Sequence, residues 1–577
     1  MDYMQRYAAW RDNAAFDEAT RAELAALADN ATEIEERFFQ DLEFGTGGLR
    51  GVLGAGTNRM NTYTVRRASQ GLADYILANS KDGKTRGVVV SHDSRRFSRQ
   101  FALETALIMV QNGIKAYVFE DLRPTPQLSF AIRHLGCVSG VMITASHNPP
   151  EYNGYKAYWD DGGQFVAPRD GEVIACVNAI EDLAGLKAAD MDEALKSGML
   201  VVLDDEVDKE YMAAVMEQSL APEIIKAMAE DFCIVYTPLN GAGAVSVPVA
   251  LKQAGFKNIF LVPEQAYPDP DFTTLAYPNP EDPAAFALGV KLAREKDADI
   301  IIATDPDGDR MGAMVKNNKG EYELLSGNMA GVLLTEYVLS KQKEKGKLPQ
   351  GAAVVSTIVS TRLTEKIAED YNAAYGEVLT GFKFIAEQIR LWEQEGKHKY
   401  VFGFEESFGY LAGDKVRDKD SVSACLLICE VAAYYKSRGL SLFDGIEEIY
   451  QKYGYYKEAV RSVTLKGLEG LAKIKATMEE LRVNPPKEIG GVLLSEFRDY
   501  KISVRKHCIS GETEAIKLPV SDVLYYGLAD GSWFCVRPSG TEPKIKIYMG
   551  VKAECGAAAD FSLENLSGAV YAFIGLE

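Results

Sequence analysis

Short apolar runs alternate with longer amphipathic stretches along most of the chain. The first series has apolar, β-branched runs at residues 87–91, 115–119 and 137–143, and the residues between them show the period of helices that end near Asn79 and Asn112. Strands separated by helices of about ten to twenty residues predict βαβ units and a largely parallel sheet. We therefore predict an α/β domain in this part of the chain.

The same alternation occurs twice more. A second series has predicted strands at residues 231–236 and 299–303, and a third has predicted strands at 352–357 and 400–404. The residues that follow the third series are richer in strands, which predicts a smaller domain of a different kind. The pattern thus favours three consecutive α/β domains with mixed sheets and a smaller C-terminal α+β domain.

Changes in this pattern also give the predicted domain boundaries. We place the four domains at residues 1–208, 209–326, 327–450 and 451–577. Residues 1–45 carry helical periodicity and many charges, so we expect helices that lead into the first domain.

A polar turn at residues 144–150 follows directly on the apolar run at residues 137–143. It contains Ser146, His147 and Asn148, and its two prolines prevent it from continuing as a helix. Because ligands of parallel sheets bind beyond the carboxyl ends of the strands, Ser146 is a candidate nucleophile. An ordinary turn, in which Ser and Asn bond their own backbone, is the alternative.

Three aspartates alternate along a loop that follows another apolar run. The aspartates are Asp305, Asp307 and Asp309. Carboxylates packed this closely repel one another unless a cation intervenes, and hard oxygen ligands favour Mg²⁺. An EF-hand would need glutamate where the sequence has Lys316, so the alternative is a solvated acidic turn. Arg310 follows the aspartates and could bind phosphate through its planar guanidinium.

Two further polar loops follow predicted strands. Glu405 and Ser407 lie two positions apart, so in an extended chain both face one side and can hydrogen-bond adjacent sugar hydroxyls. The alternative is that the adjacent glutamates Glu405 and Glu406 begin a helix, because the helix dipole favours acidic residues at its N-terminus. The second of these loops lies near residue 540 and offers a guanidinium, hydroxyls and backbone N–H groups that could bind a phosphate monoester. The alternative is a plain turn between two strands. The residues of this loop are Arg537, Ser539, Gly540 and Thr541, with Lys546 on the following strand.

The four loops, in this order, resemble those of the α-D-phosphohexomutase superfamily, and the resemblance covers nearly the whole chain. The segments Gly-Thr-Gly-Gly-Leu-Arg-Gly at 45–51 and Gly-Phe-Glu-Glu-Ser-Phe-Gly-Tyr at 403–410 are most similar to the phosphoglucomutase/phosphopentomutase branch. The resemblance implies the same layout of four domains around a central cleft, with a mobile fourth domain that could close it.

The resemblance also implies roles for individual residues. Ser146 is carried as phosphoserine, and the three aspartates hold Mg²⁺ against that phosphate, with Ser146 as a further metal ligand. Lys156, on the short strand after the serine loop, is the implied general acid/base, and Arg50 lies beside it. His147 is the other candidate base, because imidazole titrates near neutrality. We rank Lys156 first, because a lysine desolvated among other cations has a lowered pKa.

Sugar and phosphate recognition follow from the same resemblance. Glu405 and Ser407 match residues that bind the hydroxyls at positions 3 and 4, and the Arg537 loop matches one that holds the non-reacting phosphate. Further sugar-loop positions match Thr380, Gly381, Lys383 and Lys419.

The implied reaction interconverts glucose 1-phosphate and glucose 6-phosphate through a hexose 1,6-bisphosphate, which also serves as activator. Phosphopentomutase or phosphomannomutase activity is the alternative for the sugar. A phosphatase that passes the phosphoryl group from the serine to water is an alternative of another class, and a silent sugar-phosphate sensor is a third.

Composition narrows the remaining possibilities. The formal charge of −20 argues against nucleic acid as a partner, since nucleic-acid binding needs clustered cationic surface. No run of apolar residues is long enough for a membrane span, and the first residues do not resemble a secretion signal, so we expect a cytoplasmic protein. Its eight cysteines are scattered, as in a reducing compartment. We expect a monomer or a weak homodimer that binds a small phosphosugar.

Overall fold

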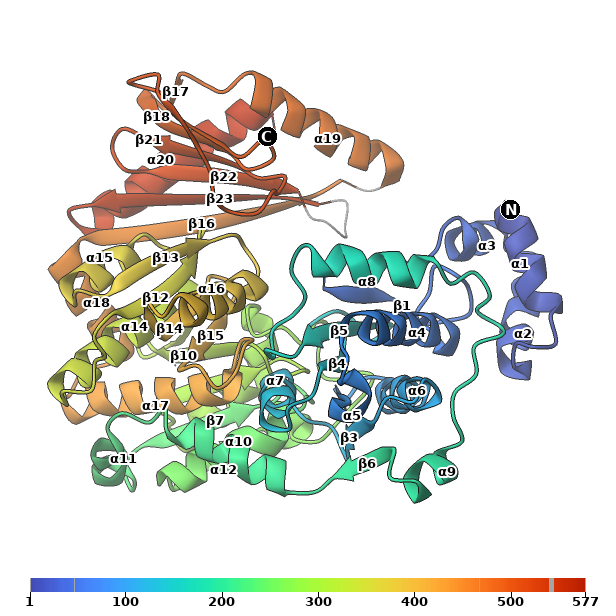
Figure 1. The fold of residues 1–577 in the computed structure, drawn as a ribbon. Helices are drawn as coiled ribbons and strands as arrows, with labels where there is room; N and C mark the ends of the chain where they lie inside the picture. The colour runs from blue at the N-terminus through green and yellow to red at the C-terminus, as the bar shows by residue number, and fades with distance from the viewer. Residues whose placement is uncertain (1, 46, 466, 539–543, 576–577) are drawn as a thin grey trace.

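The computed structural model describes residues 2–45, 47–465, 467–538 and 544–575. Four β-sheets follow one another along the chain, each with its own helices (Figure 1). The first three sheets mix parallel and antiparallel strands, which confirms the predicted fold class. Within the described part of the chain, no helix has the length and apolar content that crossing a bilayer requires.

The sequence predicts helices at the N-terminus, and the structure has three of them, which form a small unit with its own core. They are α1 (Tyr3–Asp12), α2 (Glu18–Ala25) and α3 (Ala31–Phe38). Trp10 stacks on Phe16 with ring centroids 4.3 Å apart, and both rings are buried. Arg37 of α3 donates a hydrogen bond of 3.1 Å to the carbonyl oxygen of Ala55. The unit therefore supports the segment that follows the first strand.

The first sheet has the strand order β1-β5-β4-β2-β3-β6. Its strands are β1 (Gly48–Val52), β2 (Val88–His92), β3 (Ala116–Phe119), β4 (Ser139–Ile143), β5 (Tyr152–Trp159) and β6 (Leu200–Leu203). Its helices are α4 (Thr62–Asn79), α5 (Gly83–Arg86), α6 (Ser98–Gln111), α7 (Thr125–His134), α8 (Arg169–Asn178) and α9 (Met191–Lys196). Strands β4, β2, β3 and β6 are parallel, so the loops after β4 and β2 leave the same edge side by side.

Both faces of this sheet are covered, which explains its continuous apolar runs. Val88 and Val90 of β2 pack into the core that includes α4 and α6, whereas Val89 packs into the core that includes α7. Alternate side chains of a strand point to opposite faces, so burial on both faces leaves no polar position in between.

The second and third sheets repeat the arrangement. The second, in the order β11-β10-β9-β7-β8, has strands β7 (Cys233–Thr237), β8 (Asn258–Leu261), β9 (Ile300–Thr304), β10 (Met311–Lys316) and β11 (Tyr322–Leu324). Its helices are α10 (Glu206–Met216), α11 (Pro222–Met228), α12 (Gly243–Ala254) and α13 (Ala287–Lys296), with 3₁₀ turns η1 (Pro263–Gln265) and η2 (Pro283–Phe286).

The third sheet has the order β13-β12-β14-β15. Its strands are β12 (Ala352–Thr357), β13 (Ala374–Val378), β14 (Lys399–Glu405) and β15 (Gly409–Ala412). Its helices are α14 (Gly327–Glu344), α15 (Leu363–Asp370), α16 (Phe382–Glu395), α17 (Ser421–Ser437) and α18 (Leu442–Tyr453). Strand β14 is parallel to β12 and turns directly into the antiparallel β15.

The fourth sheet is antiparallel in every pairing that the structure describes. Its strands are β16 (Tyr455–Thr464), β17 (Glu488–Ile489), β18 (Val492–Asp499), β19 (Val504–His507), β20 (Thr513–Ala515), β21 (Leu524–Leu528), β22 (Trp533–Pro538) and β23 (Lys544–Ala553), and its helices are α19 (Gly467–Val483) and α20 (Gly556–Ile574). Figure 1 shows this part, in orange and red, above the third sheet. Tyr525 and Trp533 of this sheet pack with Ile358 and Leu379 of the third domain. The last domain therefore rests on the third through an apolar contact.

A buried carboxylate joins the second and third domains. Glu430 of α17 is fully buried and accepts hydrogen bonds from the backbone N–H groups of Leu220 (2.9 Å) and Ala221 (2.8 Å). Its Oε1 also accepts the hydroxyl of Tyr337 at 3.0 Å, and its Oε2 accepts the hydroxyl of Ser219 at 2.5 Å. The carboxylate thus satisfies donors at the start of α11 and on α14.

Replacing Glu430 should destabilise the contact between these domains. Glu430→Ala leaves several buried donors without acceptors, and each unpaired donor costs about 1–3 kcal/mol. We therefore expect the free energy of unfolding in the first transition to fall by about 3 kcal/mol or more. Urea denaturation followed by circular dichroism measures this loss. Glu395→Ala, at an exposed helix position, is the control and should change stability by less than about 0.5 kcal/mol. Equal stability of the two variants would contradict the assignment.

Candidate active site

Ser146 lies in the loop between β4 and β5 and is almost fully buried, with 3% of its surface exposed. Its φ of 53° is in the left-handed region, which is strained for a residue with a Cβ atom. Its backbone N–H donates to Thr144 Oγ1 at 2.7 Å, and its hydroxyl donates to Asp305 Oδ2 at 2.8 Å. The hydroxyl therefore contacts a carboxylate of the second domain as well as its neighbour in the loop, His147.

The three aspartates lie in the loop between β9 and β10 and are all buried. One oxygen from each lies within 4.8 Å of the others. Asp305 Oδ1 accepts the backbone N–H groups of Asp309 (3.1 Å) and Arg310 (3.0 Å). Gly308, with φ of 62°, provides the left-handed turn that brings the aspartates together.

This cluster fits a divalent cation. Asp307 Oδ1 and Asp309 Oδ1 are buried oxygens without a hydrogen-bond partner, although buried polar atoms are normally paired. Burial, together with the charges of Asp307 and Asp309, raises the pKa of Asp305 well above its ordinary value. Hard carboxylate oxygens that repel one another and lack donors are the ligands that Mg²⁺ and similar ions take.

Two lysines from different domains contact the cluster. Lys156 of β5 places Nζ 2.5 Å from Asp307 Oδ2 and 3.0 Å from Asp309 Oδ2. Lys419, in the loop before α17, places Nζ 3.2 Å from Asp309 Oδ2 and 3.9 Å from Glu405 Oε1. The aspartate loop, the serine strand pair and the sugar loop of the sequence prediction therefore meet at one point.

The predicted lowering of the Lys156 pKa is wrong for this arrangement of charges. Burial alone would lower the pKa, but the carboxylates of Asp307 and Asp309 outweigh it and raise the pKa of Lys156 above its ordinary value. The neighbouring cation, Lys419, only partly opposes them. Neighbouring cations alone would lower the pKa of Lys156, but its ammonium group also touches two anions of another domain.

His147 and Arg50 also lie at the serine loop. His147 Nδ1 is 3.1 Å from Ser146 Oγ, so this side chain points at the candidate nucleophile and not away from it. Burial, aided by the charges of Arg310 and Arg50, lowers the pKa of His147 well below its ordinary value. Arg50 Nη1 donates to Asn148 Oδ1 at 3.2 Å. Since Arg50 pairs with Gly154 across β1 and β5, it shares a sheet face with Lys156.

Arg310 is held beside the cluster by Glu281, a residue that the sequence pattern did not indicate. Its Nη1 donates to Glu281 Oε1, and its Nε lies 3.9 Å from Asp309 Oδ1. The guanidinium therefore lies where an anion next to the aspartates would meet it. Glu281 lies between Pro280 and Pro283, just before η2, and belongs to none of the motifs that the sequence pattern indicated.

Glu405 and Ser407 do not lie in one extended segment. Glu405 is the last residue of β14, and Ser407 lies in the tight turn to β15, in which Phe408 has φ of 62°. The expectation that alternation along a strand directs both side chains to one side is therefore wrong. The alternative of a helix N-terminus is also wrong, because a β-hairpin forms here. Glu405 still contacts Lys419 of the cluster.

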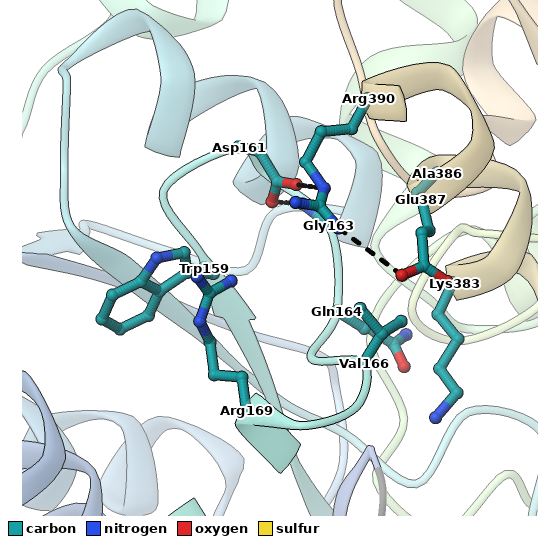
Figure 2. Close-up of a pocket in the computed structure, with 10 residues that line it drawn as sticks. All are labelled: Trp159, Asp161, Gly163, Gln164, Val166, Arg169, Lys383, Ala386, Glu387 and Arg390. Carbon is teal, nitrogen blue, oxygen red and sulfur yellow. Dashed lines mark hydrogen bonds and ion pairs between the residues drawn. The ribbon is translucent and has the colours of Figure 1, made fainter. Parts of the chain in front are cut away.

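The remaining sugar-loop positions lie at the start of α16. Thr380 and Gly381 connect β13 to this helix, and Gly381 precedes its first residue. Lys383 Nζ lies 3.8 Å from Asp170 Oδ2 of the first domain, and burial lowers the pKa of Lys383. Figure 2 shows Lys383 in a pocket between the first and third domains. In this pocket Arg390, from the same helix as Lys383, lies 3.4 Å from Asp161. The contact of Lys383 is thus with an aspartate of the first domain.

The fourth loop is described only in part. Arg537 at the end of β22 and Lys546 on β23 are opposite each other in the ladder, and both are half-buried. Ser539, Gly540 and Thr541 lie outside the described residues. The described part brings a guanidinium and an ammonium group to the base of this loop.

Sequence reasoning missed several residues that position the cluster. Thr125 at the start of α7 donates from its hydroxyl to Asp307 Oδ2 at 2.8 Å, and Ser421 at the start of α17 donates to the carbonyl oxygen of Gly308 at 2.6 Å. Asp418 accepts the hydroxyl of Tyr158 at 2.9 Å beside Lys419. Helix starts that face a common edge of neighbouring sheets are the one signal that could have indicated Thr125 and Ser421.

Family models match the chain in the order of its sheets. The models described as phosphoglucomutase/phosphomannomutase α/β/α domains I, II and III match residues 41–184, 209–320 and 326–453, and the model of the C-terminal domain matches residues 475–561. The chain belongs to the phosphoglucomutase/phosphomannomutase family.

Individual relatives agree with the family. The phosphoglucomutase of Staphylococcus haemolyticus (strain JCSC1435) is 36% identical over 553 residues, which are 96% of this chain and 97% of that protein. The phosphoglucomutase of Staphylococcus aureus (strain USA300) is 37% identical over 527 residues, 91% of this chain and 92% of that protein.

Solved structures show the same fold. The phosphoglucomutase pp63/parafusin of Paramecium, in its open form, has a TM-score of 0.67 at 16% identity and covers 93% of this chain and 95% of its own. A phosphoglucomutase/phosphomannomutase family protein of Burkholderia thailandensis has a TM-score of 0.64 at 17% identity and covers 92% of this chain and 97% of its own.

Removing one carboxylate should weaken metal binding. Asp307→Asn takes away one of three anionic ligands, so we expect the dissociation constant for Mg²⁺ or Mn²⁺ to rise at least about tenfold. Isothermal titration calorimetry measures it. Asp297→Asn, on the surface of the same domain, is the control and should leave the constant unchanged. Equal affinities of the two variants would mean that the cation binds elsewhere.

Proposed function

We propose that the protein is a phosphoglucomutase that interconverts glucose 1-phosphate and glucose 6-phosphate through a phosphoserine at Ser146 and a bound hexose 1,6-bisphosphate. The observation that carries this proposal is the hydrogen bond of 2.8 Å between Ser146 Oγ and Asp305 Oδ2. It joins the proposed nucleophile of the first domain to the aspartate cluster of the second, which fits a divalent cation, in a chain of this family. Phosphoryl transfer needs little more than a positioned oxygen and neutralised charge.

In the proposed reaction, the bond between Ser146 Oγ and phosphorus breaks as a sugar hydroxyl bonds to the same phosphorus. The bisphosphate then reorients, and its other phosphate returns to Ser146. Asp305, Asp307 and Asp309 would hold Mg²⁺, which would withdraw charge from the phosphoryl group and weaken the attraction of Asp307 and Asp309 for the Lys156 ammonium group. Lys156 is the proposed carrier that takes the proton of the sugar hydroxyl and returns it in the reverse step, with Arg50 beside it.

The other loops would hold the substrate. Glu405 and Ser407 are the proposed ligands of two sugar hydroxyls, with Thr380, Gly381, Lys383 and Lys419 around them. Arg310 lies at the cluster for the reacting phosphate, and Arg537 and Lys546 lie at the loop for the non-reacting phosphate. Closure of the fourth domain would exclude water from the phosphoserine.

The proposal also includes the domain boundaries, the cellular location, the partner and the assembly of the protein. We place the domains at residues 1–208, 209–326, 327–450 and 451–577, because each range holds one complete sheet. We propose a cytoplasmic location, supported by the free thiols of the cysteines. The proposed partner is a small phosphosugar, with no nucleic acid or membrane, and the proposed assembly is a monomer or weak homodimer.

Ser146→Ala should abolish turnover without unfolding the protein. The methyl group cannot accept a phosphoryl group, so we expect the rate of glucose 6-phosphate formation from glucose 1-phosphate to fall at least about a thousandfold. Coupling to glucose-6-phosphate dehydrogenase measures the rate, with Mg²⁺ and catalytic glucose 1,6-bisphosphate present. An unchanged melting temperature is the control for folding. A variant that keeps full activity would refute the proposed mechanism.

The same assay separates the alternatives. We expect the wild-type protein to form isomerised sugar phosphate with little free phosphate, whereas a phosphatase would release phosphate in proportion to substrate consumed. A faster turnover of mannose 1-phosphate or ribose 1-phosphate than of glucose 1-phosphate would replace the proposed sugar.

Lys156 and His147 can be distinguished by substitution. Lys156→Met removes the proposed proton carrier and should lower kcat by about 100-fold or more, since general acid–base catalysis contributes about 10²–10⁴. His147→Gln keeps a polar group at the nucleophile and should lower kcat by less than about tenfold. Steady-state kinetics with saturating Mg²⁺ measures both. The opposite order of effects would assign the proton to His147.

A further inference from the structure

One arginine from a neighbouring loop holds the backbone of the serine loop. Arg95 follows β2, the strand beside β4, and its side chain has no exposed surface. Its Nη1 donates to the carbonyl oxygens of Pro149 (2.7 Å) and Tyr152 (3.1 Å). Its Nη2 donates to the carbonyl oxygens of Ser146 (2.5 Å) and Asn148. A single guanidinium thus gathers four carbonyl groups of the loop.

Arg95 is itself held from two sides. Asp93 Oδ1 accepts the backbone N–H of Arg95 at 2.9 Å, and Asp93 Oδ2 lies 3.3 Å from its Nε. The buried ring of Phe272, in the second domain, has its centroid 5.0 Å from the guanidinium carbon. Next to it, Arg96 forms an ion pair of 2.5 Å with Asp271. The position of the guanidinium therefore depends on the domain that also carries the aspartate cluster.

We propose that Arg95 is a positioning residue for Ser146 and that Phe272 fixes Arg95 from the second domain. This inference rests on the proposed function, because it takes Ser146 as the nucleophile. Ser146 has a strained φ of 53°, and strain persists only where the surroundings enforce it. Charge-assisted hydrogen bonds to the Ser146 carbonyl and its neighbours supply that enforcement. Arg95 bonds to main-chain oxygens only and so acts through the loop.

The contacts of Ser146 and Arg95 also fix the position of the second domain relative to the serine loop of the first. The hydroxyl of Ser146 bonds to Asp305, and its carbonyl bonds to Arg95, so both ends of the residue are held by groups that the second domain positions. A small shift of the second domain would therefore move the aspartates and the serine loop together.

The test uses the full-length protein with saturating Mg²⁺ and glucose 1,6-bisphosphate. In Arg95→Ala we expect kcat to fall about 100-fold, because misplacing a reacting group by about 1 Å has that effect, while KM stays within about threefold. Added guanidinium chloride, below denaturing concentration, should restore part of kcat. Arg95→Lys should be intermediate, since one ammonium group cannot reach four carbonyls. Arg99→Ala, at an exposed position of α6, is the matched control and should behave as wild type.

A second readout does not depend on turnover. Hydrogen–deuterium exchange of the peptide covering residues 145–152 should be faster in Arg95→Ala than in wild type or Arg99→Ala, because the loop loses its anchor. Phe272→Leu keeps an apolar side chain but removes the ring, and should shift exchange and kcat in the same direction by a smaller factor. If Arg95→Ala does not fold, the comparison of Phe272→Leu with wild type tests the proposal instead.

The outcomes separate this inference from the proposed function. Unchanged kcat in Arg95→Ala, with or without faster exchange, would overturn the positioning role. Equal losses in kcat and in affinity for substrate, with no rescue by guanidinium, would also overturn it, because they indicate general damage. A wild-type protein that does not isomerise glucose phosphates would contradict the proposed function, and the exchange comparison would still decide whether Arg95 orders the loop.

Discussion

The structure depends on the balance of charge around three buried aspartates. Asp305, Asp307 and Asp309 bring three carboxyl groups into a space from which water is excluded, and unbalanced charge there would cost several kcal/mol per group. Lys156, Lys419 and Arg310 bring positive charges to the same place, where Lys419 also pairs with Glu405 and Asp418, and Arg310 with Glu281. Because these cations come from three different domains, the charge balance exists only when the domains are assembled.

This balance bears on how the proposed ligands would enter. A divalent cation adds two positive charges and a phosphoserine adds about two negative charges, so the pair together leaves the net charge unchanged. Either group alone would change the net charge of the site by about two. The cation and the phosphate are therefore expected to stabilise each other.

The sequence predicted the elements that follow from local pattern and missed those that depend on contacts between domains. The strand before Ser146, the strand before Asp305 and the alternation of the three α/β domains follow from apolar runs and their spacing, and the structure contains them. The boundary between β14 and its turn was not predictable from the Glu405 and Ser407 spacing, because the tight turn depends on Phe408 adopting a left-handed conformation. The pKa of Lys156 was mispredicted for the same kind of reason, since Asp307 and Asp309 lie in another domain.

Arg95 shows where sequence reasoning could have gone further. Asp93 and Arg95 follow the predicted strand at residues 87–91, and that strand lies beside β4 in the sheet. The rule that assigned Ser146 to a strand end applies equally to them, because parallel neighbours end at one edge. What the rule cannot supply is Phe272, which reaches the guanidinium from a loop of the second domain. The position of strand ends therefore indicates which groups of one sheet face a site. The groups that fix them from a second domain can be identified only from the three-dimensional structure.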